Sequence, residues 1–406
     1  MSAAPESPRP LNEQTIAAVQ RRIGIPVRRT ARMHNEICSV DSFRQFAQGY
    51  GDDNPLYSDP AYAQSSSWGA SLAPPLYAYS AGKWRPVDWT EGQRAEMTSG
   101  DPLANIGQYM CGERWIFTKS VRAGDVLIRE QSMFSAELKS SSFGGGQGAL
   151  VSHRLAWEDE SGSPYAVRFL DYWHADRNKS RAAGKHRHVE SPAYSDEDLE
   201  RIDHLYANET RRGATPFLVG DVAVGDTLGP IVKGPMTVSD IVYWHAGIGM
   251  GDLGLGAFKL SYKNRQRMPG FYQKDRFGAW DAAIRVHWDQ SAAARLGQPE
   301  SYDYGFMRTN WMVHLITNWM GDGAWIWQLS FAVKKFNYVG DVHYVSGTVG
   351  EVDPSTNRVT IDVALVNQRD ETTACGRAIV ILPEAAGGSA QIPQYDDTDV
   401  CEAATP

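Results

Sequence analysis

Apolar side chains recur at helical spacing near the start of the chain. Ile16 and Val19, set among polar neighbours, predict a short helix within residues 12–22. The apolar positions that follow Ser39 keep the same spacing up to Tyr50, and the Ser39 hydroxyl is suited to cap the first turn. We therefore expect a second helix, which delivers the chain to a segment rich in Gly, Asp and Asn.

Alternating and continuously apolar runs predict strands after this helical region. In the first half of the chain they cover residues 25–32, 132–140, 150–158 and 164–172, and residues 114–128 read as a strand, a Gly-Asp turn and a second strand. In the second half, residues 359–366 and 378–382 have the same character, and residues 306–315 carry a strong helical pattern. Helices followed by a series of strands favour an α+β fold over an alternating βαβ array.

The two halves of the chain contain parallel motifs. The segment from His287 to Ala293 matches the segment from Tyr57 to Ala63 position for position. A helix start at Thr237 likewise matches the start at Ser39. These repeats predict two modules of one kind in tandem.

Composition places the boundaries of these modules. The segment between the halves changes from basic to acidic and is predicted to be a linker, while both ends of the chain are polar and rich in small residues. The predicted organisation is a tail at 1–11, a first module at 12–175, a linker at 176–215, a second module at 216–384 and a disordered tail at 385–406.

The most specific motif begins at Gly51. The sequence Gly51-Asp52-Asp53-Asn54-Pro55-Leu56-Tyr57-Ser58-Asp59, with Ala63 four residues later, resembles the signature of the MaoC-like dehydratases and (R)-specific enoyl-CoA hydratases. That signature is Gly-Asp-x-Asn-Pro-aliphatic-His, followed by an Asp and an Ala. The resemblance implies an α+β tandem (double) hot-dog fold, in which each module is an antiparallel sheet wrapped around a central helix. It also implies reversible hydration of 2-enoyl-CoA to 3-hydroxyacyl-CoA, with coenzyme A as part of the substrate and no separate cofactor.

The first half contains only some of the catalytic groups that this reaction needs. The resemblance implies that an Asp and a His of the signature activate water, and that a backbone N–H at the start of the central helix stabilises the thioester oxygen. Asp52 and Asn54 fit the signature, but Tyr57 stands where the His belongs. Tyr57 can donate a hydrogen bond, yet its ordinary pKa near 10 makes it a poor base. Pro74 and Pro75 remove N–H donors where the central helix would begin.

The second half contains the catalytic groups that the first half lacks. His287 occupies the His position and is the candidate base, while Ala282 stands where the Asp belongs. Asp281, one residue away, and Asp52 are the candidate acidic partners. Gly305 precedes the predicted helix 306–315, so its N–H is the candidate donor to a developing oxyanion.

A further group of residues is assigned to substrate binding: Asn54, Tyr302, Tyr304, Lys263, Arg265 and Arg267. The basic members lie in a predicted insertion, residues 247–276, where they can meet the phosphates of coenzyme A. An ordinary solvated face explains these basic residues equally well.

Other classes of function find little support. The net charge of −8 gives no reason to expect nucleic acid, and no apolar run is long enough for a membrane span or a signal peptide, so we expect a cytoplasmic protein. The four cysteines are far apart, and the histidines show no metal-ligand spacing, so no metal is predicted. Residues 249–254 fit Gly-x-Gly-x-x-Gly but do not follow a strand, which argues against a dinucleotide site.

Two alternatives stay open because neither half has the complete Asp and His pair. The chain can be a non-catalytic acyl-CoA-binding module, or one half of a heteromeric hydratase; a homodimer is the expected assembly. A hot-dog thioesterase is disfavoured because residues 306–320 contain no carboxylate. Abundant aromatic residues allow a bulky acyl group without specifying one.

Overall fold

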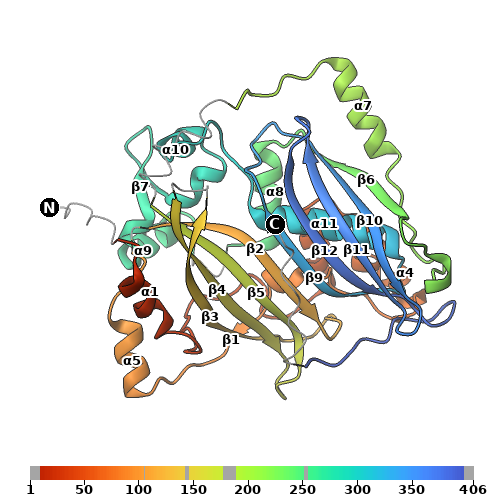
Figure 1. The fold of residues 1–406 in the computed structure, drawn as a ribbon, viewed down its shortest axis with the longest axis horizontal. Coiled ribbons are helices and arrows are strands. Elements are labelled where there is room, and N and C mark those ends of the chain that lie inside the picture. The colour runs from red at the N-terminus through yellow and green to blue at the C-terminus, as the bar shows by residue number, and fades with distance from the viewer. Residues whose placement is uncertain (1–9, 105, 142–145, 177–188, 251–254, 397–406) are drawn as a thin grey trace.

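A computed structural model describes residues 10–104, 106–141, 146–176, 189–250 and 255–396. Its main feature is one ten-stranded sheet with the order β1-β3-β4-β5-β2-β9-β12-β11-β10-β6 (Figure 1). The first half supplies β1 (Lys83–Trp84), β2 (Gly107–Phe117), β3 (Ile128–Ser141), β4 (Gly146–Glu158) and β5 (Pro164–Ala175). The second half supplies β6 (Thr227–Lys233), β9 (Trp325–Val333), β10 (His343–Asp353), β11 (Arg358–Asn367) and β12 (Thr372–Ile381).

The two halves join through one strand pair. Strands β2 and β9 run antiparallel, with Glu113 opposite Phe331 and Trp115 opposite Leu329. The sheet is therefore continuous across the halves, and each half contributes a block of antiparallel strands on its own side of this pair. A separate small hairpin, β7 (Tyr272–Lys274) with β8 (Trp280–Ala282), lies outside the main sheet.

The helices differ in length and in depth of burial. The α-helices of the described residues are α1 (Glu13–Gln20), α2 (Val40–Gln48), α3 (Pro55–Ser58), α4 (Pro60–Ser65), α5 (Glu91–Thr98), α7 (Asp196–Ala207), α8 (Val238–Ile248), α9 (Lys259–Arg267), α10 (Gln290–Arg295) and α11 (Gly305–Met320). Helix α11 is almost wholly buried and contacts β6, β9, β10, β11 and β12, so the second half wraps its strands around a central helix (Figure 1). None of these helices is both long and apolar enough to cross a membrane.

The described residues of the first half contain no matching central helix, which corrects the expectation of one in each module. The equivalent segment contains only a 3₁₀ turn, η1 (Tyr77–Tyr79). Pro74 and Pro75 precede it, and each proline removes a backbone N–H that a helical turn would use. The predicted strand at residues 25–32 is also wrong: this segment touches β3 only through isolated bridges.

Described residues beyond β12 pack against the rest of the protein, which corrects the prediction of a disordered tail from residue 385; residues 397–406 of that prediction lie outside the described residues. Ala390 is buried, and its N–H donates to the Gly323 carbonyl at 2.7 Å. Tyr395 packs against the apolar cluster that contains Ile116 and Trp327. Contacts with the outer face of the sheet therefore hold this segment, although its composition is that of a loop.

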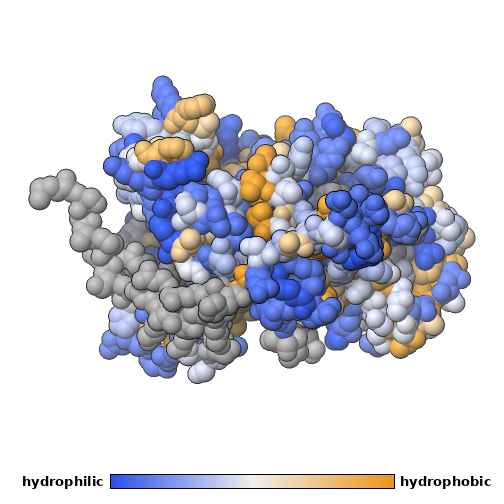
Figure 2. All heavy atoms as spheres, turned by 90° about the horizontal axis from the view of Figure 1, so that it is seen from above, coloured by the Kyte–Doolittle hydropathy of each residue, from blue (hydrophilic) through white to orange (hydrophobic). Residues whose placement is uncertain are grey.

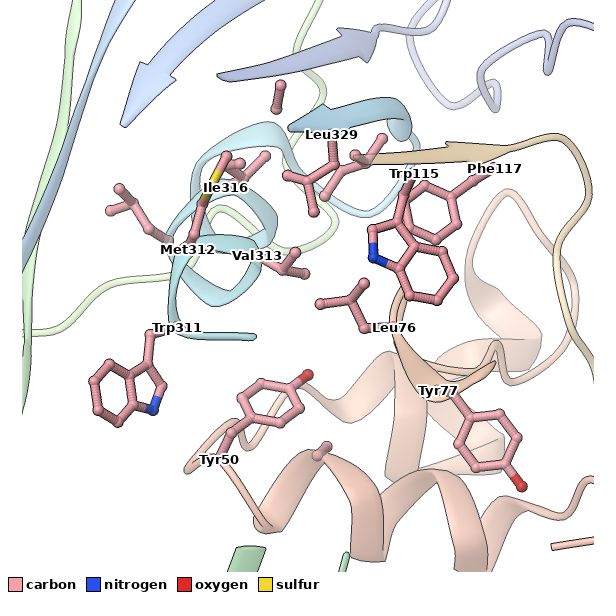
Figure 3. Close-up of a cluster of buried hydrophobic side chains, with 14 of the residues drawn as sticks. Tyr50, Leu76, Tyr77, Trp115, Phe117, Trp311, Met312, Val313, Ile316 and Leu329 are labelled. Atoms are coloured by element: carbon pink, nitrogen blue, oxygen red, sulfur yellow. The ribbon is translucent and has the colours of Figure 1, made fainter. Parts of the chain in front are cut away.

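One hydrophobic core spans both halves. Figure 3 shows Leu76 and Trp115 of the first half close to Val313 and Leu329 of the second. Each large side chain removed from water contributes about 1.5–3 kcal/mol, so this shared core binds the halves together. Viewed from above, the surface is mainly hydrophilic, with a narrow hydrophobic band between two hydrophilic lobes (Figure 2).

Candidate active site

A cavity of about 520 Å³ lies where the two halves meet. The first half lines it with the start of β2 and the end of β5, and the second half with the residues around the start of α11 and the end of β9. The lining residues are Gln108, Tyr109, Met110, Cys111, Tyr172, Trp173, His287, Tyr302, Asp303, Tyr304, Gly305, Phe306, Arg308, Val333, Lys334, Lys335 and Phe336. Most of them are aromatic or apolar, as in pockets that bind organic ligands.

His287 ends the short 3₁₀ helix η5 (Ala283–His287) and lies in this cavity. Its Nδ1 is 2.7 Å from the carbonyl oxygen of Tyr302. Because a carbonyl only accepts, Nδ1 carries the hydrogen and Nε2 keeps its lone pair. Burial lowers the pKa of His287 to about 4, so the ring is neutral at pH 7. A neutral imidazole can accept a proton at Nε2.

Gly305 begins helix α11 beside His287. The N–H groups of a first helical turn have no intrahelical acceptor, and no side chain caps this helix. A Cβ atom at position 305 would lie 2.5 Å from the Met110 sulfur, so only glycine fits there without movement. The Met307 N–H donates to the Tyr304 carbonyl at 2.9 Å. The Gly305 N–H and the positive end of the helix dipole are therefore what the start of α11 offers to a carbonyl oxygen in the cavity.

Asp303 is the one carboxylate among the lining residues. Its Oδ2 accepts from Asn337 Nδ2 at 2.9 Å and pairs with Arg308 Nε at 2.8 Å, while Oδ1 has no hydrogen-bond partner within the described chain. Burial raises its pKa to about 6, outweighing the opposite effects of Arg308 and Asn337. Sequence analysis did not single out this residue, although it stands two positions before Gly305.

Tyr304 connects His287 to a second histidine. Its ring stacks on the His287 ring, and its hydroxyl is 2.8 Å from His245 Nε2 on α8. Burial lowers the pKa of His245 to about 4, so both rings are neutral at pH 7. His245 thus anchors the tyrosine that covers one face of the candidate base.

The comparisons with known proteins agree with this architecture. Residues 28–168 match the family described as "FAS1-like, dehydratase domain region". A solved structure titled "MaoC-like dehydratase" is similar over 90% of this chain and 99% of its own, at 14% identity and a TM-score of 0.59. A conserved hypothetical protein of Mycobacterium tuberculosis, described as having a double hotdog fold, is similar over 87% of this chain and 96% of its own, at 10% identity and a TM-score of 0.50. The chain has the double hot-dog fold of the MaoC-like dehydratases. No curated protein matches it in sequence.

In this double hot-dog protein the signature Asp52 lies away from the His287 cavity. Its Oδ1 accepts from the Asn54 N–H at 2.9 Å, and its Oδ2 accepts from the Tyr50 hydroxyl at 3.1 Å. Its nearest basic group is His314 Nε2 on α11, 3.8 Å from Oδ1. Asp52 is absent from the cavity lining, so the expectation that it assists His287 is not supported.

A buried ionic network surrounds Asp52. Lys233 Nζ is 2.7 Å from His314 Nδ1, and Glu209 Oε1 is 3.0 Å from His314 Nε2. The ammonium of Lys233 also donates to the Tyr50 carbonyl at 3.1 Å. Burial lowers the pKa of Lys233, although Glu209 and Asp52 oppose this effect. Side chains from both halves and the linker therefore fill the space around the first signature.

The remaining signature residues make local contacts away from the His287 cavity. The Asn54 side chain accepts from the Leu56 N–H at 3.0 Å and caps α3. Tyr57 and Asn54 line a separate cavity of about 30 Å³, which has room for about one water. Burial raises the pKa of Tyr57 well above its ordinary value, which excludes it as a base near neutral pH.

The other predicted site residues separate into two groups. Tyr302 and Tyr304 line the cavity. Asp281 instead accepts from the Ala282 N–H at 2.7 Å and lies 4.0 Å from Arg285, so it does not complete a pair with His287. The basic residues of α9, namely Lys263, Arg265 and Arg267, are not among the cavity-lining residues. Within the described residues, no group of three His, Cys, Asp or Glu side chains can hold a metal ion.

Proposed function

We propose that this chain hydrates 2-enoyl-CoA thioesters reversibly to 3-hydroxyacyl-CoA thioesters in the cavity between its halves. One observation carries the proposal: His287 and the start of α11 line the same cavity. Hydration needs a base beside the β-carbon and donors at the thioester oxygen, and these two elements can supply them. The match of residues 28–168 to a dehydratase family supports the same class of reaction.

The reaction follows from these positions. His287 Nε2 takes a proton from water as the water oxygen bonds to the β-carbon. The π electrons then move to the thioester oxygen, where the Gly305 N–H and its neighbours in the first turn stabilise the negative charge. The imidazolium returns its proton to the α-carbon as the enolate collapses, so one water is added in all. Dehydration is the reverse.

Asp303 takes the place of the missing signature carboxylate in this proposal. It is the one carboxylate among the lining residues, and its Oδ1 is without a hydrogen-bond partner within the described chain. In its ionised form, Oδ1 can accept the second hydrogen of the attacking water. Arg308 and Asn337 hold the other oxygen and so fix the carboxylate in place.

The residues that line the cavity also bear on the size of the acyl group. Aromatic rings from both halves form much of the wall, including Tyr109, Trp173 and Phe336. Rings of this kind pack well against flat or bulky groups. We therefore propose an acyl group larger than crotonyl as the preferred substrate.

The test is hydration of crotonyl-CoA and of bulkier enoyl-CoA thioesters by the purified chain, followed at the enoyl absorbance. Turnover that His287→Gln abolishes supports the proposal. Tight binding of thioesters without turnover would support the second candidate, an acyl-CoA-binding module or half of a heteromeric enzyme. The observation that favours this second candidate is the lack of any carboxylate bonded to His287, whose Nδ1 partner is a backbone carbonyl.

A further inference from the structure

Lys334 is a cation without a counter-charge at the candidate active site. It follows the last residue of β9 and is one of the residues that line the cavity. Its Nζ is out of contact with water, and within the described chain it has no hydrogen-bond partner and no carboxylate within 4 Å. An ammonium without a counter-charge is unfavourable away from water, so a bound anion would stabilise the site.

The other charges of the lining are already paired. Arg308 meets Asp303, and its Nη1 also donates to the Lys335 carbonyl at 2.8 Å. The Lys335 side chain pairs with Glu371 at 2.6 Å on the exposed side. Lys334 is therefore the one cation among the lining residues whose charge remains for a ligand.

The indole N–H of Trp173 is a second buried donor without a hydrogen-bond acceptor in the described chain. Trp173 also lines the cavity. Two donors without a partner among the described residues, one of them charged, thus belong to residues that line a mostly apolar cavity. A carboxylate has enough lone pairs to accept from both.

The position of Lys334 indicates which part of the substrate carries the anion. Its neighbour Val333 places a methyl carbon 3.6 Å from where a Cβ of Gly305 would be. The backbone of Lys334 therefore follows directly on a residue that packs near the start of α11, where the thioester carbonyl is proposed to bind. The phosphates of coenzyme A are separated from that carbonyl by the length of the pantetheine arm, whereas a substituent of the acyl group is not.

We propose that Lys334 binds a carboxylate on the acyl group, so that the preferred substrates are 2-enoyl-CoA thioesters with a second, free carboxyl group. This inference rests on the proposed hydratase function. It predicts that glutaconyl-CoA, which carries a terminal carboxylate, is hydrated with a higher kcat/KM than crotonyl-CoA. A charge-assisted hydrogen bond in a cavity of this kind corresponds to a preference of about tenfold or more.

The test compares Lys334→Met with Lys335→Met on both substrates. We expect Lys334→Met to lower kcat/KM for glutaconyl-CoA at least tenfold more than for crotonyl-CoA. Lys335→Met removes an adjacent positive charge that already pairs with Glu371, so it should leave the ratio of the two values unchanged. An unchanged ratio in Lys334→Met would overturn the inference.

Two further experiments distinguish failure of the carboxylate site from failure of the hydratase function. In the first, Lys334→Met could lower kcat/KM equally for glutaconyl-CoA and crotonyl-CoA, yet leave kcat/KM unchanged for the matching pantetheine thioesters. This result would show that Lys334 contacts a phosphate of coenzyme A, and it would overturn the proposal. Calorimetric binding of the unreactive glutaryl-CoA and butyryl-CoA tests the same preference without turnover. If nothing is hydrated but Lys334→Met still weakens only glutaryl-CoA, the hydratase function fails while the carboxylate site stands.

Discussion

The ring of Tyr304 lies on the ring of His287, with centroids 3.7 Å apart and planes inclined by 27°. Tyr304 is itself held by the hydrogen bond between its hydroxyl and His245. The Tyr302 carbonyl fixes the His287 Nδ1 hydrogen from a second direction. A stacked tyrosine and a backbone carbonyl therefore orient the candidate base, where the related signature would use an aspartate.

The first prediction concerns His287 itself. We expect His287→Gln to lower kcat by about 10²–10⁴, the usual contribution of a positioned general base, with little change in Tm. The measurement is steady-state hydration of the best enoyl-CoA substrate, with thermal unfolding of the same samples. His204→Gln is the control, because that histidine is exposed on α7. Retained activity in His287→Gln would remove His287 from the mechanism.

The second prediction tests the approach to the start of α11. In Gly305→Ala the new methyl meets the Met110 sulfur and displaces the first helical turn, so we expect kcat to fall about tenfold or more. Helix propensity itself favours alanine over glycine by up to about 1 kcal/mol, so the loss is not one of helix formation. The double variant Gly305→Ala/Met110→Ala should recover part of the activity. Failure to recover would show that contact with Met110 is not the cause.

The third prediction separates Asp52 from the chemistry. Asp52→Asn disturbs a buried network with Tyr50 and His314, so we expect it to lower the free energy of unfolding by about 1–3 kcal/mol. At a temperature where the variant is folded, its kcat should match that of the wild type. Denaturant unfolding and steady-state kinetics on the same preparation check both parts. A loss of kcat of about 10² without a loss of stability would return Asp52 to the active site.

The fourth prediction concerns pH. Because the pKa of Asp303 is raised to about 6 and that of His287 is lowered to about 4, His287 is already neutral between pH 5 and 8, while Asp303 ionises. The proposed role of the Asp303 carboxylate therefore predicts that kcat/KM rises as pH increases through about 6. Asp303→Asn should lower the activity and remove this step.

The same shift has a consequence for stability with a definite sign. A folded-state pKa above the unfolded value means that the folded chain binds the proton more tightly. The contribution of Asp303 is therefore fully present below the unfolded pKa of about 4, and it is lost as pH rises through about 6. Unfolding free energies at pH 5 and pH 7 should differ less in Asp303→Asn than in the wild type. An equal difference in both proteins would assign this pH dependence to other groups.

Local patterns were enough to identify the residues on each side of the candidate reaction. His287 was found because its segment repeats the first signature, and Gly305 because it precedes a strongly periodic helix. The tandem organisation followed from the same repeat, and the hot-dog fold from the resemblance that the motif beginning at Gly51 carries. Both inferences depend on residues that are close together in the sequence, where spacing alone defines position on a helix or turn.

Residues brought in from distant elements were missed. Met110, which packs against Gly305, lies on β2 of the other half, and His245 reaches Tyr304 from α8. Asp303 gave no signal because its raised pKa arises from burial in the folded chain, against the lowering effects of Arg308 and Asn337. Lys334 was indistinguishable in sequence from its paired neighbour Lys335.

The sequence by itself thus determined the repeated modules, the histidine and the helix start, because each is encoded in a short stretch with its own periodicity. Only the tertiary structure decided that Asp52 joins Lys233 and His314 in a buried network instead of assisting His287. The physical reason is that burial and charge pairing are set by which strands and helices meet. In this chain the decisive contacts join residues far apart in the sequence: Lys233 is 81 positions from His314, and Asp52 is 262 positions from it.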